Sequence, residues 1–177
     1  GEIVMRSSQE AFGLRSFQSI PELTKDLLSR NFLLRKKARA ELVEIGEPSL
    51  DFLIELAKNK DEKVRWEAII TIVQIGSKQT LDVLMNALED DEFSIRWLAA
   101  EGLINFGKSV VVPLLQKLQS NPDSAYLRRG AQHVLYELQK TGIFNDNYGL
   151  VDQLSNEFDH SGVSAKIQPT IDSIRLM

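Results

Sequence analysis

The sequence lacks cysteine altogether, which excludes disulfides, thiolate metal sites and a cysteine nucleophile. With only two histidines, His133 and His160, a multi-histidine metal centre is not expected. No apolar run approaches the about 18 residues of a membrane span, and the start of the chain lacks the apolar core of a signal peptide. The first residue is Gly1 rather than methionine, which indicates processing or a longer parent protein. We therefore expect a cytoplasmic protein with no metal, no cofactor and no membrane partner.

Basic residues are also fewer than acidic ones. The chain has 21 lysines and arginines against 25 aspartates and glutamates, a formal net charge of −4. Proteins that bind nucleic acids usually carry a net basic surface, because their affinity comes from neutralising phosphates. We therefore expect no nucleic-acid partner. The one basic run, RKKAR at residues 35–39, is expected to be a solvated helix face, with a docking patch as the alternative.

What the sequence has instead is internal repetition. Four segments align on an arginine, and the arginines recur 30, 31 and 32 residues apart: Arg35, Arg65, Arg96 and Arg128. Three residues after each arginine comes an alanine: Ala38, Ala68, Ala99 and Ala131. Seven and ten residues after it come apolar side chains: Leu42, Ile72, Leu103 and Leu135, then Ile45, Ile75, Phe106 and Leu138. A repeat of this period is typical of stacked structural units.

Each segment carries the signals of a helix, a tight turn and a second helix. The helix starts are marked by Asn31, Asp61, Glu92 and Ser124. Three of these are good N-caps, and Asp91 is the alternative to the glutamate. Gly46, Gly76 and Gly107 suit helix ends with positive φ, whereas the fourth segment runs on to Gly142. Amphipathic second helices are predicted at residues 48–58, 78–90 and 109–119.

A two-helix unit cannot bury its apolar faces alone, so neighbouring units must stack. The predicted fold is all-α: a right-handed α-solenoid of helix-turn-helix repeats. The solenoid is expected to span residues 21–140, with a capping helix at 21–29 and repeats that start near 31, 61, 92 and 124. Residues 1–20 are expected to be an extension, either a short helix or partly disordered. Residues 141–177 are expected to be a degenerate repeat or cap, with one helix that includes Phe158 and another bent by Pro169.

The pattern Asp-x-x-Val-Arg-x-x-Ala…Leu-x-x-Ile-Gly resembles the HEAT repeat, in the short form of the phycobilisome (PBS) lyase HEAT-like group. The second segment matches it almost column for column, with Asp61, Val64, Arg65, Ala68, Ile72, Ile75 and Gly76. The resemblance covers roughly residues 31–140. It is specific for the fold and weak for the activity, because one fold serves many functions.

The arginines lie between two apolar flanks of the predicted helix and therefore point inward. A buried guanidinium needs hydrogen-bonded, charged partners, and its geometry suits carboxylates and helix-end carbonyls. We therefore predict a structural Arg–Asp ladder through the inter-repeat turns, with Asp61 and Asp91 as acidic members. An anion site formed by the four arginines is the alternative. The same helical wheel places Glu67 on the solvent side.

Three further groups are candidates for binding. Trp66 and Trp97 directly follow two of the arginines; packing between repeats is the structural explanation, and an aromatic patch for a ligand or peptide is the alternative. His133 is expected at the surface without a catalytic partner, and His160 in a polar loop. The exposed side of the second helices, expected on the concave face, forms a candidate partner-binding strip: Asp51, Glu55, Asp82, Asn86 and Gln116.

No phosphate-binding loop, HExxH pattern or triad-like spacing occurs in the sequence. We therefore expect an interaction scaffold or adaptor without catalysis of its own, whose partner is a protein or peptide of basic character. The family resemblance implies an alternative, because bilin lyase subunits with this repeat attach or detach phycobilin chromophores on antenna proteins. A chromophore-protein chaperone belongs to the same alternative. A HEAT-like DNA glycosylase or other nucleic-acid binder is a third candidate, against which the acidic strip argues.

Overall fold

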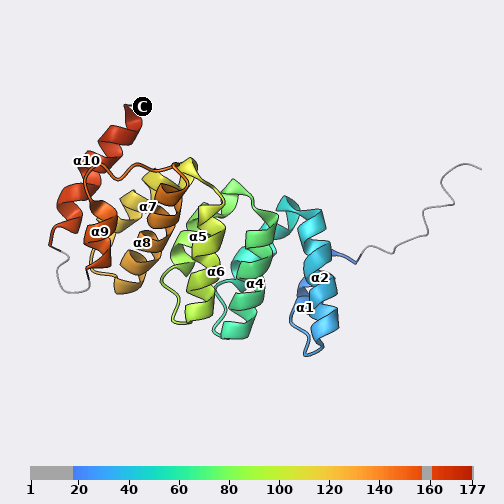
Figure 1. Cartoon of the computed structure of the whole chain (residues 1–177). Coiled ribbons are helices and arrows are strands. Elements are labelled where there is room, and N and C mark those ends of the chain that lie inside the picture. The colour runs from blue at the N-terminus through green and yellow to red at the C-terminus, as the bar shows by residue number, and fades with distance from the viewer. Residues whose placement is uncertain (1–17, 157–160, 177) are drawn as a thin grey trace, which may run out of the picture.

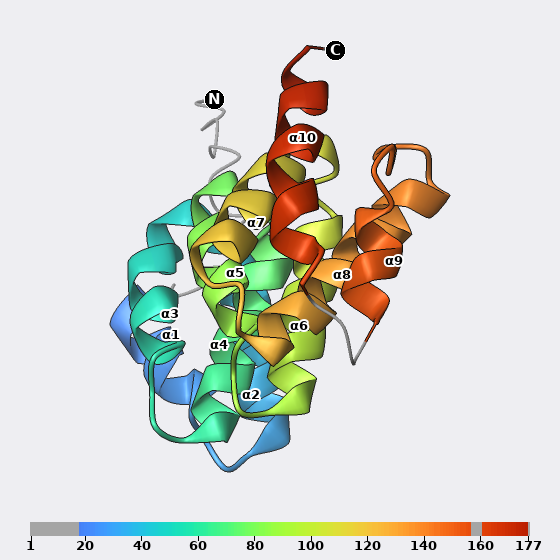
Figure 2. The same cartoon turned by 90° about the vertical axis from the view of Figure 1, so that its left-hand side faces the viewer.

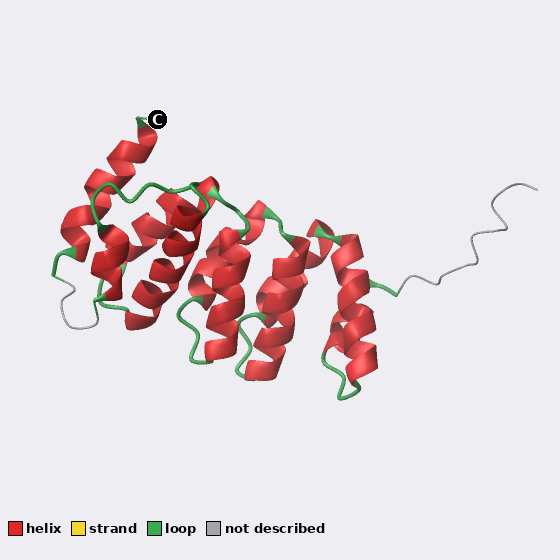
Figure 3. Ribbon diagram, in the orientation of Figure 1, coloured by secondary structure: helices red, strands yellow, loops and turns green. Residues whose placement is uncertain are grey.

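The computed structural model describes residues 18–156 and 161–176, and within these residues it contains helices and no strands. The first helices are α1 (Ile20–Leu27), α2 (Phe32–Ile45), α3 (Leu50–Leu56), α4 (Glu62–Ile75) and α5 (Leu81–Ala87). They are followed by α6 (Phe93–Ile104), α7 (Lys108–Ser120), α8 (Ala125–Lys140), α9 (Leu150–Ser155) and α10 (Val163–Arg175). Short loops join them (Figure 3). The predicted all-α class is confirmed; the expectations for residues 1–17, Phe158 and His160 lie outside the described residues.

The helices pair and stack as the repeat predicts. The first helices of the repeats, α2, α4, α6 and α8, stand side by side, and each packs on the next (Figure 1). Their partners α1, α3, α5 and α7 form a second layer, as the view turned by 90° shows (Figure 2). At the C-terminal end, α9 packs on α8, and α10 packs on α7 and α9. No helix in the described part of the chain is long and apolar enough to cross a bilayer.

The helix starts are fixed largely by the expected caps. Side-chain oxygens of three residues accept backbone N–H bonds at the starts of α2, α4 and α8: Asn31, Asp61 and Ser124. Glu92 makes no side-chain cap bond at the start of α6. There the carboxylate of Asp90, not of Asp91, accepts the N–H of Glu92 at 2.9 Å. That N–H belongs to the cap residue and not to the first turn of the helix, so neither Glu92 nor the predicted alternative Asp91 caps α6 with its side chain.

The helix ends also follow the sequence signals. Gly46, Gly76 and Gly107 have φ values of 74°, 66° and 57°, which only glycine adopts without strain. After the first two of these glycines the chain makes one 3₁₀ turn, Glu47–Ser49 and Lys78–Thr80, before the second helix. In the fourth repeat the first helix, α8, continues to Lys140, as predicted from the absence of a closing glycine at the aligned position. Pro169 lies inside α10.

The aligned columns form one continuous core along the stack. The alanine column is at most 2% exposed, and the column seven residues after the arginines is fully buried. Two glycines bring neighbouring repeats closer still. A Cβ atom on Gly102 would lie 2.6 Å from Cγ2 of Val73, and one on Gly130 would lie 2.9 Å from Cδ2 of Leu88. Distances this short show that α6 packs too tightly on Val73, and α8 on Leu88, for a side chain at either glycine.

Candidate functional site

The four aligned arginines tie each first helix to the turn that precedes it. In every case Nη1 donates a hydrogen bond to the carbonyl six residues earlier, at 2.6 to 2.9 Å. Arg35, Arg65 and Arg96 also bond the carbonyl five residues earlier, at 2.8 to 3.1 Å. These carbonyls follow the second helix of the preceding unit, where no further helical turn can bond them. The recurrence of the arginine is thus explained by backbone capping.

Carboxylates join two of these arginines to the next repeat. Arg65 forms a two-pronged ion pair with Asp90, with Nε to Oδ2 at 2.7 Å and Nη2 to Oδ1 at 2.9 Å. Arg35 donates from Nε to Oε1 of Glu67 at 2.9 Å. The predicted acidic members were wrong: Asp61 caps α4, and the side chain of Asp91 is exposed. Glu67 lies on the following repeat and Asp90 in the turn that leads into the following repeat, neither of which a single helical wheel shows.

The Arg65–Asp90 pair is electrostatically coupled. The hydrogen bond that Arg65 donates to Asp90 raises the pKa of Arg65, whereas burial acts in the opposite direction. Burial by itself raises the pKa of Asp90. The Arg65 hydrogen bond, the Glu92 N–H and the charges of Arg65 and Arg96 outweigh burial, so the pKa of Asp90 lies below its ordinary value. The pair is therefore ionised at neutral pH and acts as a structural link.

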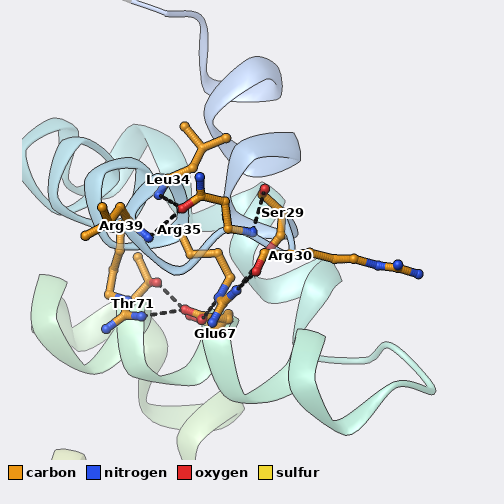
Figure 4. A network of polar contacts seen from close by, with 9 residues as sticks. Ser29, Arg30, Leu34, Arg35, Arg39, Glu67 and Thr71 are labelled. Carbon is orange, nitrogen blue, oxygen red and sulfur yellow. Dashed lines mark hydrogen bonds and ion pairs between the residues drawn. The ribbon is translucent and has the colours of Figure 1, made fainter.

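A second ion cluster lies between α2 and α4 (Figure 4). Glu67 is only 6% exposed, which contradicts its predicted place on the solvent side. It accepts from Arg35 through Oε1 and from Nη2 of Arg39 through Oε2, the latter at 2.7 Å. The buried Nε of Arg39 has no hydrogen-bond partner among the described residues. The basic run is therefore not a uniformly solvated face, since both of its arginines turn into this cluster.

A hollow of about 870 Å³ opens beside the cluster, between the first and second repeats. It lies where the end of α1 meets the start of α4, and Ser94 of the third repeat reaches its wall. Its apolar and basic lining includes Leu27, Leu28, Arg30, Lys63, Val64 and Trp66. Asp61, Glu62 and Glu67 also line it. The lining of the hollow is thus a mixture of apolar and charged side chains.

The two tryptophans differ in their surroundings. Trp66 is half-buried, and the guanidinium carbon of Arg39 lies 5.5 Å from its ring centroid. Trp97 is 48% exposed. Its ring lies 6.3 Å from that of Phe93 and 4.8 Å from that of His133. Packing between repeats accounts for Trp66, whereas Trp97 presents half of its surface to solvent.

Trp97 is the centre of what we call the aromatic patch: Phe93, Arg96, Trp97, Tyr126 and His133. Within it, the guanidinium carbon of Arg96 lies 4.0 Å from the Tyr126 ring centroid. Phe93 is 68% and Tyr126 40% exposed. Tryptophan, tyrosine and arginine are the residues most enriched in the energetic centres of protein interfaces. The aromatic patch therefore has the composition of a docking surface.

His133 has a partner that the sequence did not reveal. Its Nε2 lies 2.9 Å from Oε1 of Glu101. The two residues are one repeat apart and stand at equivalent positions, five residues after Arg128 and Arg96. The repeat period itself was the signal that could have found this pair. The contact orients the imidazole against Trp97, and no serine or second histidine contacts it among the described residues.

The predicted partner-binding strip is exposed on the second-helix layer. Its members lie on α3, α5 and α7: Asp51, Glu55, Asp82, Asn86 and Gln116. Asn86 accepts from Nζ of Lys117 at 2.7 Å, and Glu55 pairs with Lys58 at 3.0 Å. Its role in binding stays a prediction. In residues 18–156 and 161–176, no group of three or more His, Cys, Asp or Glu side chains could hold a metal ion.

Comparison with known proteins points to one fold. Residues 50–136 match the family model for HEAT repeats. No curated protein sequence matches the chain. A similar solved structure is the complex of CpcE and CpcF of phycocyanin lyase from Nostoc sp. PCC7120, with a TM-score of 0.53 and 24% sequence identity. The match covers 85% of this chain and 96% of that chain, so the likeness extends over nearly the whole of that fold.

Proposed function

Since this chain belongs to the HEAT-repeat family, we propose that it is a protein-binding subunit of a bilin lyase-like or chromophore-protein chaperone complex. The observation that carries the proposal is the fold match over 96% of a chain in the CpcE–CpcF complex. The lyase in that structure is a complex of two proteins. By analogy, this chain is proposed to bind a protein partner and, with it, a chromophore-bearing substrate.

The aromatic patch is the proposed docking surface for that work. Trp97 combines a large exposed ring with a fixed orientation, since Phe93 and His133 hold it from two sides. A pre-oriented aromatic side chain loses little conformational entropy on binding. The proposed contribution of this chain is binding and orientation, without catalysis of its own.

Chromophore binding is tested by titration with biliverdin, an open-chain tetrapyrrole. The chain has only two tryptophans, so their fluorescence reports on two known places. We expect a change in visible absorbance together with quenching that persists in Trp66→Phe and is largely lost in Trp97→Phe. If the absorbance of biliverdin is unchanged by the protein at any concentration, this chain alone does not bind the chromophore.

Partner binding is tested by affinity capture from extract of the source organism, with three baits. The first is the native chain, the second carries Phe93→Ala and Trp97→Ala, and the third carries Asp51→Lys, Glu55→Lys and Asp82→Lys. Proteins captured by the first and third baits but lost on the second support the aromatic patch. Loss on the third bait alone assigns binding to the strip on the second helices instead.

A visible absorbance scan of the captured material separates the two functions. A coloured partner supports the lyase-like or chaperone function. A colourless partner that depends on the aromatic patch supports the wider scaffold function, in which no chromophore takes part. If all three baits capture the same proteins, neither surface is the docking site and the proposal fails.

A further inference from the structure

The turns that lead into the first helices gather on one edge of the stack. We call this the turn edge: residues 28–33, 58–63, 89–94 and 121–126. None of these residues is buried. Large apolar side chains stand exposed along it: Leu28, Phe32, Leu33, Phe93 and Tyr126. At the opposite edge, residues 46–49, 76–80 and 105–108 expose no large apolar side chain, but the turn after α8 exposes Ile143 and Tyr148. Exposed apolar groups that recur along an edge are typical of an interaction surface.

Charge divides the turn edge into two halves. The first two turns carry four cations, Arg30, Lys58, Lys60 and Lys63, against two carboxylates. The last two turns carry five carboxylates and no cation: Glu89, Asp90, Asp91, Glu92 and Asp123. The edge is thus basic at one end and acidic at the other. Such an edge is complementary to a reversed copy of itself.

Several charges of the turn edge face solvent. Within residues 18–156 and 161–176, the side chains of Arg30, Lys63, Asp91 and Glu92 are exposed and form no hydrogen bond or ion pair, whereas Lys58 pairs with Glu55. Within the acidic half, Asp90 is paired with Arg65, and Glu89 accepts from Lys117 and Asn121. Within the basic half, Asp61 caps α4 and Glu62 stays exposed between the cations. Outward cations therefore dominate the first two turns and outward carboxylates the last two.

Shape agrees with charge. The hollow lies in the basic half, and its lining includes apolar Leu28 and Val64 together with Arg30 and Lys63. Of the three carboxylates in the lining, Glu67 is paired with Arg35 and Arg39 and Asp61 caps α4, which leaves only Glu62 to oppose these two cations. Phe93, 68% exposed and preceded by two acidic residues, lies in the acidic half. Ser94 lines the hollow, so the turn that carries Phe93 is the hollow's immediate neighbour. A two-fold axis between the two features would let each copy place Phe93 against the hollow of the other.

We propose that two copies of this chain associate antiparallel through their turn edges, with Phe93 and its carboxylates seated in the partner copy's hollow. The contact is isologous, so each pairing occurs twice. The four turns supply 24 residues, which falls within the roughly 20–30 residues per partner of a standard interface. This self-association goes beyond the proposed function and needs no chromophore, but it shares Phe93 with the aromatic patch. Substitutions at Arg30 and Lys63, which lie outside the aromatic patch, therefore tell the two proposals apart.

The decisive experiment is a charge swap read by sedimentation equilibrium. One variant carries Arg30→Glu and Lys63→Glu; the other carries Asp91→Lys and Glu92→Lys. Each alone places like charges together at both contacts and is expected to associate at least about 100-fold more weakly than the native chain. Mixed together, the two variants restore opposite charges at both contacts, so a heterodimer is expected. Circular dichroism checks that each variant keeps its helices.

Three outcomes of this experiment overturn the proposal. One is a native chain that stays monomeric up to about 1 mM, a concentration at which even weak specific association is visible. Another is a mixture of the variants that associates no better than either alone. Native association that survives both charge reversals would likewise assign the interface to another surface.

Two further measurements test whether Phe93 lies in the hollow of the partner copy and whether the two copies are antiparallel. Phe93→Ala is expected to weaken association at least about tenfold, whereas Phe52→Ala, an exposed aromatic change on α3, is expected to leave it unchanged. Because the chain has no cysteine, Lys60→Cys and Asp91→Cys chains can be mixed and oxidised. Antiparallel pairing predicts more mixed disulfide than either homodimer, and a parallel arrangement predicts the reverse.

Discussion

The first and second junctions between neighbouring repeats are held by different chemistry. Between α2 and α4 the link is the cluster of Arg35, Arg39 and Glu67, and a hollow lies beside it. Between α4 and α6 the helices pack through apolar contacts, with the Arg65–Asp90 pair only at the turn, and Gly102 lets Val73 approach to a distance at which no side chain would fit. Correspondingly, α2 buries two of its residues, whereas α4 and α6 bury five each.

The difference teaches that the repeat fixes the backbone and leaves the junction chemistry free. Both junctions keep the arginine, the alanine and the apolar columns. A buried ion cluster contributes little net stability, because desolvation offsets most of the attraction. Close apolar packing contributes through burial and dispersion. We therefore expect the apolar junction to contribute more to stability than the polar one.

The largest effect is expected from breaking the ion cluster by one partner only. Glu67→Ala leaves the half-buried Arg35 and the largely buried Arg39 without their shared carboxylate. We expect the free energy of unfolding to fall by about 3–5 kcal/mol, measured by urea denaturation.

The matched control removes the buried charges together. The double variant Arg39→Leu, Glu67→Leu is expected to be clearly more stable than Glu67→Ala, because it leaves one partly exposed arginine that still bonds the Ser29 carbonyl. If the double variant is the less stable of the two, the cluster is a net source of stability, and the contrast between the two junctions is smaller than we infer.

The apolar junction is probed by filling its closest contact. Gly102→Val places branched carbon where Val73 and Leu84 already stand. Overpacking of this kind is expected to lower the free energy of unfolding by about 2–3 kcal/mol. Ala40→Val, at an exposed site on α2, controls for the helix propensity of valine and is expected to change stability by less than about 1 kcal/mol. Equal effects of the two substitutions would contradict tight packing at Gly102.

Much of the fold was predictable because the same repeat pattern occurs four times in the sequence. Alanine and aliphatic columns, cap residues and glycines recur at one period, so each helix confirms the others. The alanine column is buried throughout, and the three closing glycines have positive φ, as predicted. Gly102 and Gly130 were missed because they break the columns rather than form them. Their role is visible only when Val73 and Leu88 of other helices are in place.

The side-chain partners were harder to predict, because they cross from one repeat to another. A helical wheel places Glu67 on the solvent side of its own helix and cannot show that Arg35 and Arg39 approach it from α2. The same limit applies to the ladder, for which Asp61 and Asp91 were predicted as acidic members, whereas Arg65 pairs with Asp90. Inter-repeat contacts need the pitch of the stack, which the sequence of one repeat does not contain.

The ion pair Arg65–Asp90 links the second repeat to the turn that leads into α6. Asp90→Asn is expected to lower the free energy of unfolding at pH 7 by about 2 kcal/mol, since a charge-assisted, two-pronged bond becomes a neutral one. Folding lowers the pKa of Asp90. Its contribution is therefore complete above the unfolded value of about 3.9 and is lost as the pH falls through the lower folded value.

That pH dependence gives the measurement its control. Thermal melts of the native chain and of Asp90→Asn, taken between pH 7 and pH 2, are expected to differ at neutral pH and to converge in acid. Melts that stay equally far apart down to pH 2 would show that the substitution acts through shape and not through the charge of Asp90.

The smallest effect is expected at an inter-repeat pair of the same kind that lies at the surface. His133 and Glu101 approach to 2.9 Å, but their side chains are 26% and 47% exposed, against 14% and 9% for Arg39 and Glu67. Water competes for both groups, so a double-mutant cycle of His133→Ala and Glu101→Ala is expected to give a coupling energy below about 1 kcal/mol. The same cycle at Arg39 and Glu67 is expected to give a larger value, because removing one partner there leaves a buried charge. Comparable coupling energies in the two cycles would mean that burial does not determine how strongly these pairs stabilise the fold. The hollow would then be the remaining difference between the first junction and the others.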